Sequence, residues 1–161
     1  MNRSECVKEI MGQLNEDDIL ISSTGYISRE AYKYDRPLNF YMQGSMGNAL
    51  AIGIGIAMNI KNRVFVLNGD GSSLMNLGTM VTARALCLDN LFNFILDNKC
   101  HESTGGQKTN SSFINFAQLN KNTMVFDIER DDSIPPRIDI PNKFIAERFK
   151  NAISDLCNKQ I

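Results

Sequence analysis

The chain contains no tryptophan, only one histidine and only four prolines among its 161 residues. Its four cysteines form no CxxC pair, which argues against a structural zinc site; they are Cys6, Cys87, Cys100 and Cys157. Such scattered cysteines favour free thiols, so we expect a reducing, cytoplasmic location. The formal net charge is −1, which gives no indication of binding to nucleic acid or to an anionic membrane surface.

Long hydrophobic runs are also missing. The longest apolar tract, residues 49–58, contains two glycines and is too short to cross a bilayer. The first five residues show no apolar signal region. Hydrophobic residues make up 43% and charged residues 22%, as in a globular protein, and the length predicts a single domain over residues 1–161.

Short apolar strands do alternate with helical patterns along the chain. The predicted strands are 19–21, 39–42, 64–68, 91–96 and 123–128, and the predicted helices are 4–14, one from 28, 45–59, 72–86 and one at the C-terminus. The C-terminal helix is expected to bury one face, formed by Phe144, Ile145, Phe149, Ile153 and Leu156. Residues 129–142 contain three prolines and are predicted to be a surface connection. We predict an α/β fold with an open, mostly parallel sheet and helices on both faces.

The most informative stretch runs from Val64 to Ser73. A buried apolar strand ends there in Gly69-Asp70-Gly71, and helical spacing begins at Ser72. A helix start offers unpaired N–H groups to a phosphate, and the glycines allow a ligand to approach the backbone closely. Asp70 is therefore expected at the carboxyl end of a strand, where open α/β sheets bind their ligands.

A second strand, residues 91–96, ends in Asp97-Asn98. The spacing between Asp70 and Asn98 suits one strand-helix-strand crossover, so the two side chains should lie at the same edge of the sheet. A carboxylate, an amide oxygen and a nearby backbone carbonyl are the hard ligands that suit Mg²⁺ holding phosphate oxygens.

This arrangement resembles the diphosphate and metal signature of thiamine-diphosphate enzymes. Phe-Tyr-Met-Gln-Gly-Ser-Met-Gly at 40–47, Leu-Asp-Asn at 96–98 and Glu-Ser-Thr-Gly-Gly-Gln at 102–107 extend the match. Together they resemble the cofactor half of phosphonopyruvate decarboxylase and the β subunit of sulfopyruvate decarboxylase. Ser-Arg-Glu at 28–30 fits the same pattern, and the resemblance runs from about residue 18 to residue 127.

The resemblance implies roles for individual residues. Mg²⁺ would be bound by Asp70, Asn98 and the backbone oxygen of Cys100. Thiamine diphosphate would be bound by Thr24, Gly25, Gly44, Ser45, Met46, Gly69, Gly71, Ser72, Ser73, Glu102 and Ser103. Met46 would lie between the two cofactor rings and bend the molecule, and His101 and Gln107 are the candidate catalytic residues.

Plainer alternatives remain for several of these residues. The loop at 22–25 could simply cap a helix, Met46 could be a core residue, and His101 could be structural or solvated. Arg29 and Glu30 could form a solvated pair. Glycines in the helix at 45–59 each cost about 1 kcal/mol against alanine, which suggests close packing against the sheet or another subunit. The polar loop at 99–112 is predicted to be a lid that is mobile without ligand.

The resemblance further implies a subunit of a thiamine-diphosphate- and Mg²⁺-dependent decarboxylase. Its substrate would be pyruvate with a phosphonate or sulfonate at C3. In this family the activating glutamate lies on a separate pyrimidine-binding domain, which this chain lacks, so a partner chain is expected. Without that partner, self-association is expected. The alternatives are a non-catalytic assembly subunit and a carboligase or decarboxylase of the acetolactate synthase type.

Overall fold

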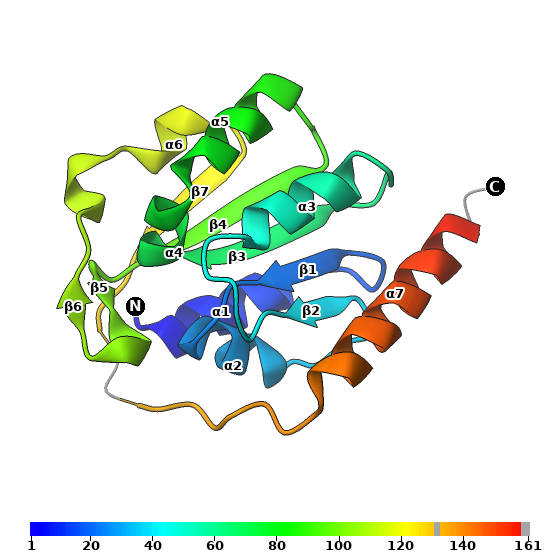
Figure 1. The fold of residues 1–161 in the computed structure, drawn as a ribbon, viewed down its shortest axis with the longest axis horizontal. Helices are drawn as coiled ribbons and strands as arrows, with labels where there is room; N and C mark the ends of the chain where they lie inside the picture. Colours follow the sequence, from blue (N-terminus) through cyan, green and yellow to red (C-terminus); the bar gives the residue numbers. More distant parts are fainter. Residues whose placement is uncertain (131–132, 159–161) are drawn as a thin grey trace.

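The computed structural model describes residues 1–130 and 133–158, and five parallel strands form its central sheet (Figure 1). These strands are β1 (Ile19–Ser22), β2 (Asn39–Tyr41), β3 (Val64–Gly69), β4 (Leu91–Asp97) and β7 (Thr123–Asp127). Their order across the sheet is β2-β1-β3-β4-β7, and every neighbouring pair is parallel. The predicted open parallel sheet is therefore confirmed.

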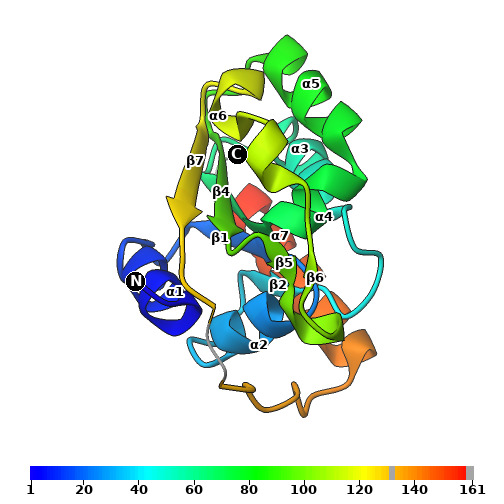
Figure 2. The same ribbon diagram turned by 90° about the vertical axis from the view of Figure 1, so that its left-hand side faces the viewer.

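Helices cover both faces of this sheet (Figures 1 and 2). On one face lie α1 (Arg3–Gly12) and α2 (Tyr26–Tyr32), and on the other lie α3 (Ala49–Ala57) and α5 (Leu77–Leu86). The remaining helices are α4 (Asp70–Met75), α6 (Phe116–Leu119) and α7 (Asn142–Asn158), and α7 packs against the edge strand β2. No helix in the described part of the chain is long and apolar enough to span a membrane.

Successive side chains along each strand point to opposite faces of the sheet, and this alternation creates two hydrophobic cores. In β3, Val64 and Val66 face the core under α3, whereas Phe65 and Leu67 face the core under α1. Because both faces of the strand are buried, its sequence is a continuous apolar run and shows no alternation of polar residues.

Gly53 brings α3 unusually close to the sheet. A Cβ atom at this position would overlap Val66 Cγ2 and would lie 3.3 Å from Leu91 Cδ1. The expected close packing of this glycine is therefore directed at the sheet. Gly55 faces outward, and a Cβ atom there would meet no other atom within 4 Å.

Two predicted helix boundaries are wrong. The helix predicted at 45–59 begins only at Ala49, because Ser45 and Gly47 adopt positive φ angles of 59° and 94°. The helix predicted at 72–86 begins at Asp70 and is interrupted at Asn76, whose φ of −145° and ψ of 56° are not helical.

The loop at 99–112 contains regular structure that the sequence did not indicate. A short hairpin joins β5 (Cys100–His101) to β6 (Gln107–Lys108), with the 3₁₀ turn η1 (Glu102–Thr104) between them. A second 3₁₀ turn, η2 (Ser111–Phe113), follows. The hairpin reverses through Gly105 and Gly106, which have φ angles of 114° and 75°.

The C-terminal helix α7 buries most of its predicted face. Ile145, Phe149 and Leu156 are buried and Ile153 is partly buried. Phe144 was predicted to be buried but is 51% exposed, and its ring instead lies 5.9 Å from the guanidinium carbon of Arg148. Within the predicted connection at 129–142, residues 131 and 132 lie outside the described residues.

Candidate functional site

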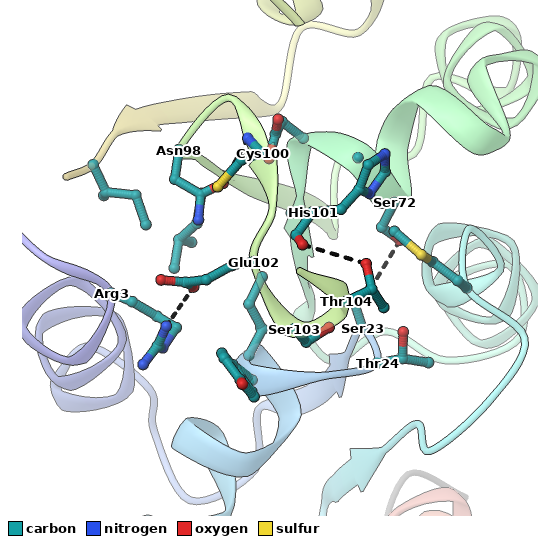
Figure 3. A pocket seen from close by; sticks show the side chains of 18 residues that line it. Arg3, Ser23, Thr24, Ser72, Asn98, Cys100, His101, Glu102, Ser103 and Thr104 are labelled. Atoms are coloured by element: carbon teal, nitrogen blue, oxygen red, sulfur yellow. Dashed lines mark hydrogen bonds and ion pairs between the residues drawn. The ribbon is translucent and has the colours of Figure 1, made fainter. Parts of the chain in front are cut away.

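The strand order places a natural ligand site between β1 and β3. The chain passes from β1 to β2 on one side and then returns to β3 on the other side of β1. Open α/β sheets bind ligands at such a reversal, outside the carboxyl ends of the strands. The loops that follow β1 and β3 meet at this point (Figure 3).

Ser72 connects the loops around this reversal. Its hydroxyl accepts hydrogen bonds from the Ser23 hydroxyl at 2.8 Å and from the Gly47 backbone N–H at 3.1 Å. It lies 3.4 Å from the Asn68 side-chain oxygen, to which it donates. The Ser72 hydroxyl thus accepts two hydrogen bonds and donates one within the protein. A ligand would therefore contact the backbone of Ser72 and not its hydroxyl.

A cavity of about 70 Å³ opens beside Ser72, between the ends of β1, β3 and β4 and the β5 hairpin (Figure 3). Most of the predicted site residues line it: Thr24, Met46, Gly69, Asp70, Gly71, Ser72, Asn98, Cys100, His101, Glu102 and Ser103. Residues from distant parts of the sequence are therefore brought together as the motifs predicted.

Five predicted site residues do not line this cavity. Gly25 borders it, with a positive φ of 81°, and a Cβ there would lie 2.8 Å from Ser103 Oγ. Gly44 and Ser45 line a different hollow, of about 380 Å³. Ser73 is buried, and its hydroxyl has no hydrogen-bond partner among the residues that the structure describes.

Gln107 is the fifth of these residues and lies on the exposed strand β6. Its side-chain oxygen lies 3.4 Å from the Thr104 hydroxyl, which donates to it. This contact stabilises the hairpin, so Gln107 has a structural partner outside the cavity.

The two predicted metal ligands follow neighbouring strands. Gly69 of β3 is in register with Leu96 of β4, so Asp70 and Asn98 come from the same edge of the sheet. Asp70 is only 1% exposed, and the Thr109 hydroxyl donates to its carboxylate. The Asn98 side-chain oxygen accepts from the backbone N–H of Cys100 at 3.1 Å.

A second buried carboxylate strengthens the negative character of this edge. Burial holds the pKa of Asp70 above its usual range, and the nearby charge of Asp97 adds to this, while the Thr109 hydrogen bond opposes it. The Ser111 hydroxyl donates to Asp97 at 2.8 Å and lies 3.2 Å from the Thr109 hydroxyl. Two carboxylates in a buried position favour a bound cation.

The described residues include no cluster of three His, Cys, Asp or Glu side chains of the kind that ligates a metal. A cation here would therefore need the amide oxygen of Asn98 and a backbone oxygen beside Asp70. Such an all-oxygen donor set fits Mg²⁺, which keeps several waters and substrate oxygens in its coordination shell.

The imidazole of His101 lies against the start of α4. A Cβ on Gly71 would be 2.5 Å from His101 Cε1 and 2.6 Å from Nδ1, so a side chain at position 71 would displace the ring. This contact places His101 on the cavity wall beside the predicted diphosphate position. Its catalytic role stays a prediction.

Sequence reasoning missed several residues of the cavity wall, namely Arg3, Ser23, Tyr26, Ile27, Leu96, Thr104 and Ile128. The interpretation of Glu30 as solvated is also wrong, because Glu30 is 1% exposed. It forms ion pairs with Lys33 at 2.6 Å and Arg3 at 3.7 Å. The Ser-Arg-Glu motif at 28–30 was the one feature of the sequence that indicated a role for Glu30.

Comparison with known proteins identifies similar sequences. The family described as thiamine pyrophosphate enzyme, C-terminal TPP binding domain, matches residues 22–134. Sulfopyruvate decarboxylase subunit beta of Methanothermobacter thermautotrophicus is 46% identical over 120 residues, which are 74% of this chain and 64% of that protein. The same subunit of Methanocaldococcus jannaschii is 36% identical over 154 residues, which are 95% of this chain and 78% of that protein.

Two further matches cover smaller shares of longer chains. Phosphonopyruvate decarboxylase of Streptomyces viridochromogenes is 42% identical over 113 residues, which are 70% of this chain and 28% of that protein. A solved structure described as a thiamin diphosphate-dependent enzyme from Mycobacterium smegmatis superimposes with a TM-score of 0.60 at 13% identity. That match covers 84% of this chain and 32% of the other, and it supports the fold alone.

Proposed function

Because this chain belongs to the thiamine pyrophosphate enzymes, as its motifs predicted, we propose that it is the diphosphate-binding subunit of a 2-oxo acid decarboxylase. The observation that carries the proposal is the cavity that joins Asp70, Gly71 and Asn98 at the carboxyl ends of β3 and β4. Relatives of this chain are named for sulfopyruvate and phosphonopyruvate. The proposed substrate is accordingly pyruvate with a sulfonate or phosphonate at C3.

The residues of the cavity fit the cofactor and its metal. Asp70, Asn98 and the backbone oxygen of Cys100 would hold Mg²⁺, and the backbone of Gly71 and Ser72 would face the diphosphate. Bound thiamine diphosphate supplies the electron sink for loss of carbon dioxide from a 2-oxo acid. The hydroxyl of Ser73, which has no partner among the described residues, is a further donor beside the same helix start.

The proposed catalytic residues differ in their positions. His101 lies on the cavity wall, where its ring could hold or donate a proton. Gln107 lies outside the cavity on β6 and would reach a substrate only after a movement of the loop at 99–112.

A partner subunit is part of the proposal. The cavity, at about 70 Å³, is smaller than the roughly 300–1,000 Å³ of a typical ligand pocket, so this chain would enclose only part of the cofactor. Glu102 is the one glutamate among the described residues that line it, and Arg3 already pairs with that carboxylate. The activating glutamate would therefore come from a pyrimidine-binding partner, in line with the subunit beta names of the relatives.

Exposed apolar side chains offer a surface for that partner. Met58 directly after α3, Met75 at the end of α4 and Val81 on α5 are 57%, 62% and 57% exposed. We propose an assembly of two copies of each chain, with self-association through the same surface when the partner is missing. The cytoplasmic location predicted from the cysteines is kept as part of the proposal.

Reconstitution tests this function. The purified chain, a candidate partner, thiamine diphosphate and Mg²⁺ are mixed, and carbon dioxide release from sulfopyruvate and from phosphonopyruvate is followed. Activity is expected only with both chains present, and the faster substrate identifies the C3 group. Full activity of this chain alone would contradict the half-site proposal, and inactivity towards both substrates would contradict the proposed substrate class.

A further inference from the structure

Arg3 is a buried cation that the cofactor motifs do not include. It lies in the first turn of α1, is 1% exposed, and precedes the segment at 22–134 that matches the family. Its guanidinium nevertheless reaches the wall of the cavity (Figure 3). Burying a charge in this way is costly unless partners surround it.

Within residues 1–130 and 133–158, Arg3 has partners in three separate segments. One terminal nitrogen pairs with the carboxylate of Glu102, in the turn between β5 and β6. The other donates to the backbone oxygen of Ser133 at 2.7 Å and lies 3.7 Å from Glu30 on α2. The guanidinium carbon also lies 5.0 Å from the centre of the Tyr26 ring, which lines the cavity.

This division of contacts uses the shape of the guanidinium group. Its planar fork allows the two terminal nitrogens to bind different segments, which a single lysine ammonium could not do in the same geometry. The Glu102 side chain is 10% exposed and is directed towards Arg3 (Figure 3). The carboxylate is thereby neutralised within a cavity that is expected to take an anionic diphosphate.

We propose that Arg3 is a positioning residue that holds the turn at Glu102–Thr104, and thus one wall of the cofactor cavity, in place. It also removes the repulsion that an unpaired Glu102 carboxylate would exert on an anionic ligand. This second consequence rests on the proposed function, whereas the positioning of the wall does not. Glu30 supplies the second buried negative charge that stabilises Arg3 from α2.

The thiol of Cys100 reports on the position of this wall. Cys100 lines the cavity two residues before Glu102, while Cys87 is exposed on the surface. Alkylation of the cofactor-free chain is read for each cysteine by mass spectrometry over a range of pH, because burial and also the Glu102 charge raise the pKa of the Cys100 thiol. The limiting rate at high pH, where the thiol is fully ionised, therefore measures opening of the wall, with Cys87 as an internal reference. Arg3→Gln and Glu102→Gln are each expected to raise the Cys100 rate about tenfold and to leave the Cys87 rate unchanged.

The double variant separates positioning from general loosening. If Arg3 and Glu102 act through one contact, Arg3→Gln combined with Glu102→Gln should label no faster than either single variant. If the increases in the Cys100 labelling rate from the two single variants multiply in the double variant, the proposal is overturned. If Arg3→Gln fails to fold, Glu102→Gln decides alone, and an unchanged Cys100 rate in that folded variant would refute the positioning role.

Arg29→Gln is the matched control. The Arg29 guanidinium carbon lies 5.2 Å from the centre of the same Tyr26 ring, but its hydrogen bond goes to Pro135. We expect an unchanged Cys100 rate, and an increase equal to that of Arg3→Gln would overturn a specific role for Arg3.

In the reconstituted complex, Arg3→Gln should weaken thiamine diphosphate binding about tenfold by calorimetry. If Arg3→Gln labels faster at Cys100 but binds thiamine diphosphate with unchanged affinity, the charge-neutralising role is refuted and the decarboxylase proposal stays intact.

Discussion

The hydroxyl of Ser23 donates a hydrogen bond of 2.8 Å to the hydroxyl of Ser72, and this bond joins the loops that follow β1 and β3. Both side chains are buried, at 2% and 3% exposure. The same Ser72 oxygen accepts from the Gly47 N–H, so one atom fixes three segments around the cavity.

Replacement of Ser72 by alanine should leave two buried donors without an acceptor. We expect a loss of about 1–3 kcal/mol in the free energy of unfolding, measured by urea denaturation. Ser73→Ala is the control, since the Ser73 hydroxyl is buried without a hydrogen-bond partner in the described part of the chain and its removal should cost no stability. Equal losses in the two variants would show that the Ser72 contacts are unimportant.

Replacement of Asp70 by alanine tests the metal assignment. The carboxylate is the one charged ligand proposed for Mg²⁺, so Asp70→Ala should abolish Mg²⁺-dependent binding of thiamine diphosphate to the reconstituted complex. Calorimetry measures this binding. Asp89→Ala removes an exposed carboxylate that pairs with Lys121 and should leave affinity unchanged. Wild-type affinity in Asp70→Ala would rule out the assignment.

The loop at 99–112 should become ordered when ligand binds. Its contacts with the body of the protein include the bonds from Thr109 to Asp70 and from Ser111 to Asp97, which end on the carboxylates at the proposed metal position. We expect amide hydrogen exchange in this loop to slow when cofactor, Mg²⁺ and a substrate analogue are added. Exchange in α7, far from the site, is the reference, and equal protection of the loop in both states would contradict a lid.

The Asp35–Arg148 pair should make stability depend on pH. Burial acts to raise the pKa of Asp35, but two hydrogen bonds from Arg148, each 2.7 Å, and one from the Tyr41 hydroxyl at 2.8 Å together prevail and hold the pKa below its ordinary value of 3.8. A carboxylate with a lowered folded pKa stabilises the protein above its unfolded pKa and loses this contribution as pH falls through the folded value.

We therefore expect Arg148→Gln to cost about 0.5–1 kcal/mol at pH 7, because the pair is partly exposed. The difference from wild type should shrink below pH 3.8 and vanish once Asp35 is protonated in both states. Urea denaturation at pH 7 and pH 3 measures it, with Lys150→Gln as an exposed control on the same helix. A difference that is constant with pH would show that packing, and not charge, is lost.

Local pattern was sufficient to predict the elements that build the site. The apolar run at 64–68 is followed by Gly69-Asp70-Gly71, and the run at 91–96 is followed by Asp97-Asn98. The structure places both runs as adjacent parallel strands. A buried parallel strand has this pattern wherever it occurs, so the prediction needed no information about distant residues.

Contacts between residues distant in the sequence determine the features that local pattern did not predict. The spacing of Leu74 and Leu77 continues a helix through Asn76, but the Asn76 side chain bonds to Asn48 at 3.3 Å and the helix breaks there. Arg3 is one of several polar residues in an amphipathic helix, and nothing in α1 itself distinguishes it as buried. Its hydrogen-bond partners Glu102 and Ser133 lie 99 and 130 residues away in the sequence, beyond the reach of any local pattern.

The pairing of Asn2 with Glu129 has a practical side. The backbone oxygen of Met1 accepts from the Glu129 backbone N–H at 3.0 Å, so the first residue is anchored two positions before Arg3, where α1 begins. An affinity tag or fusion protein joined ahead of Met1 would emerge beside the start of α1, whereas one joined after α7 would emerge at the opposite end of the molecule (Figure 1). Purification handles and immobilisation points for this protein therefore belong at the C-terminal end.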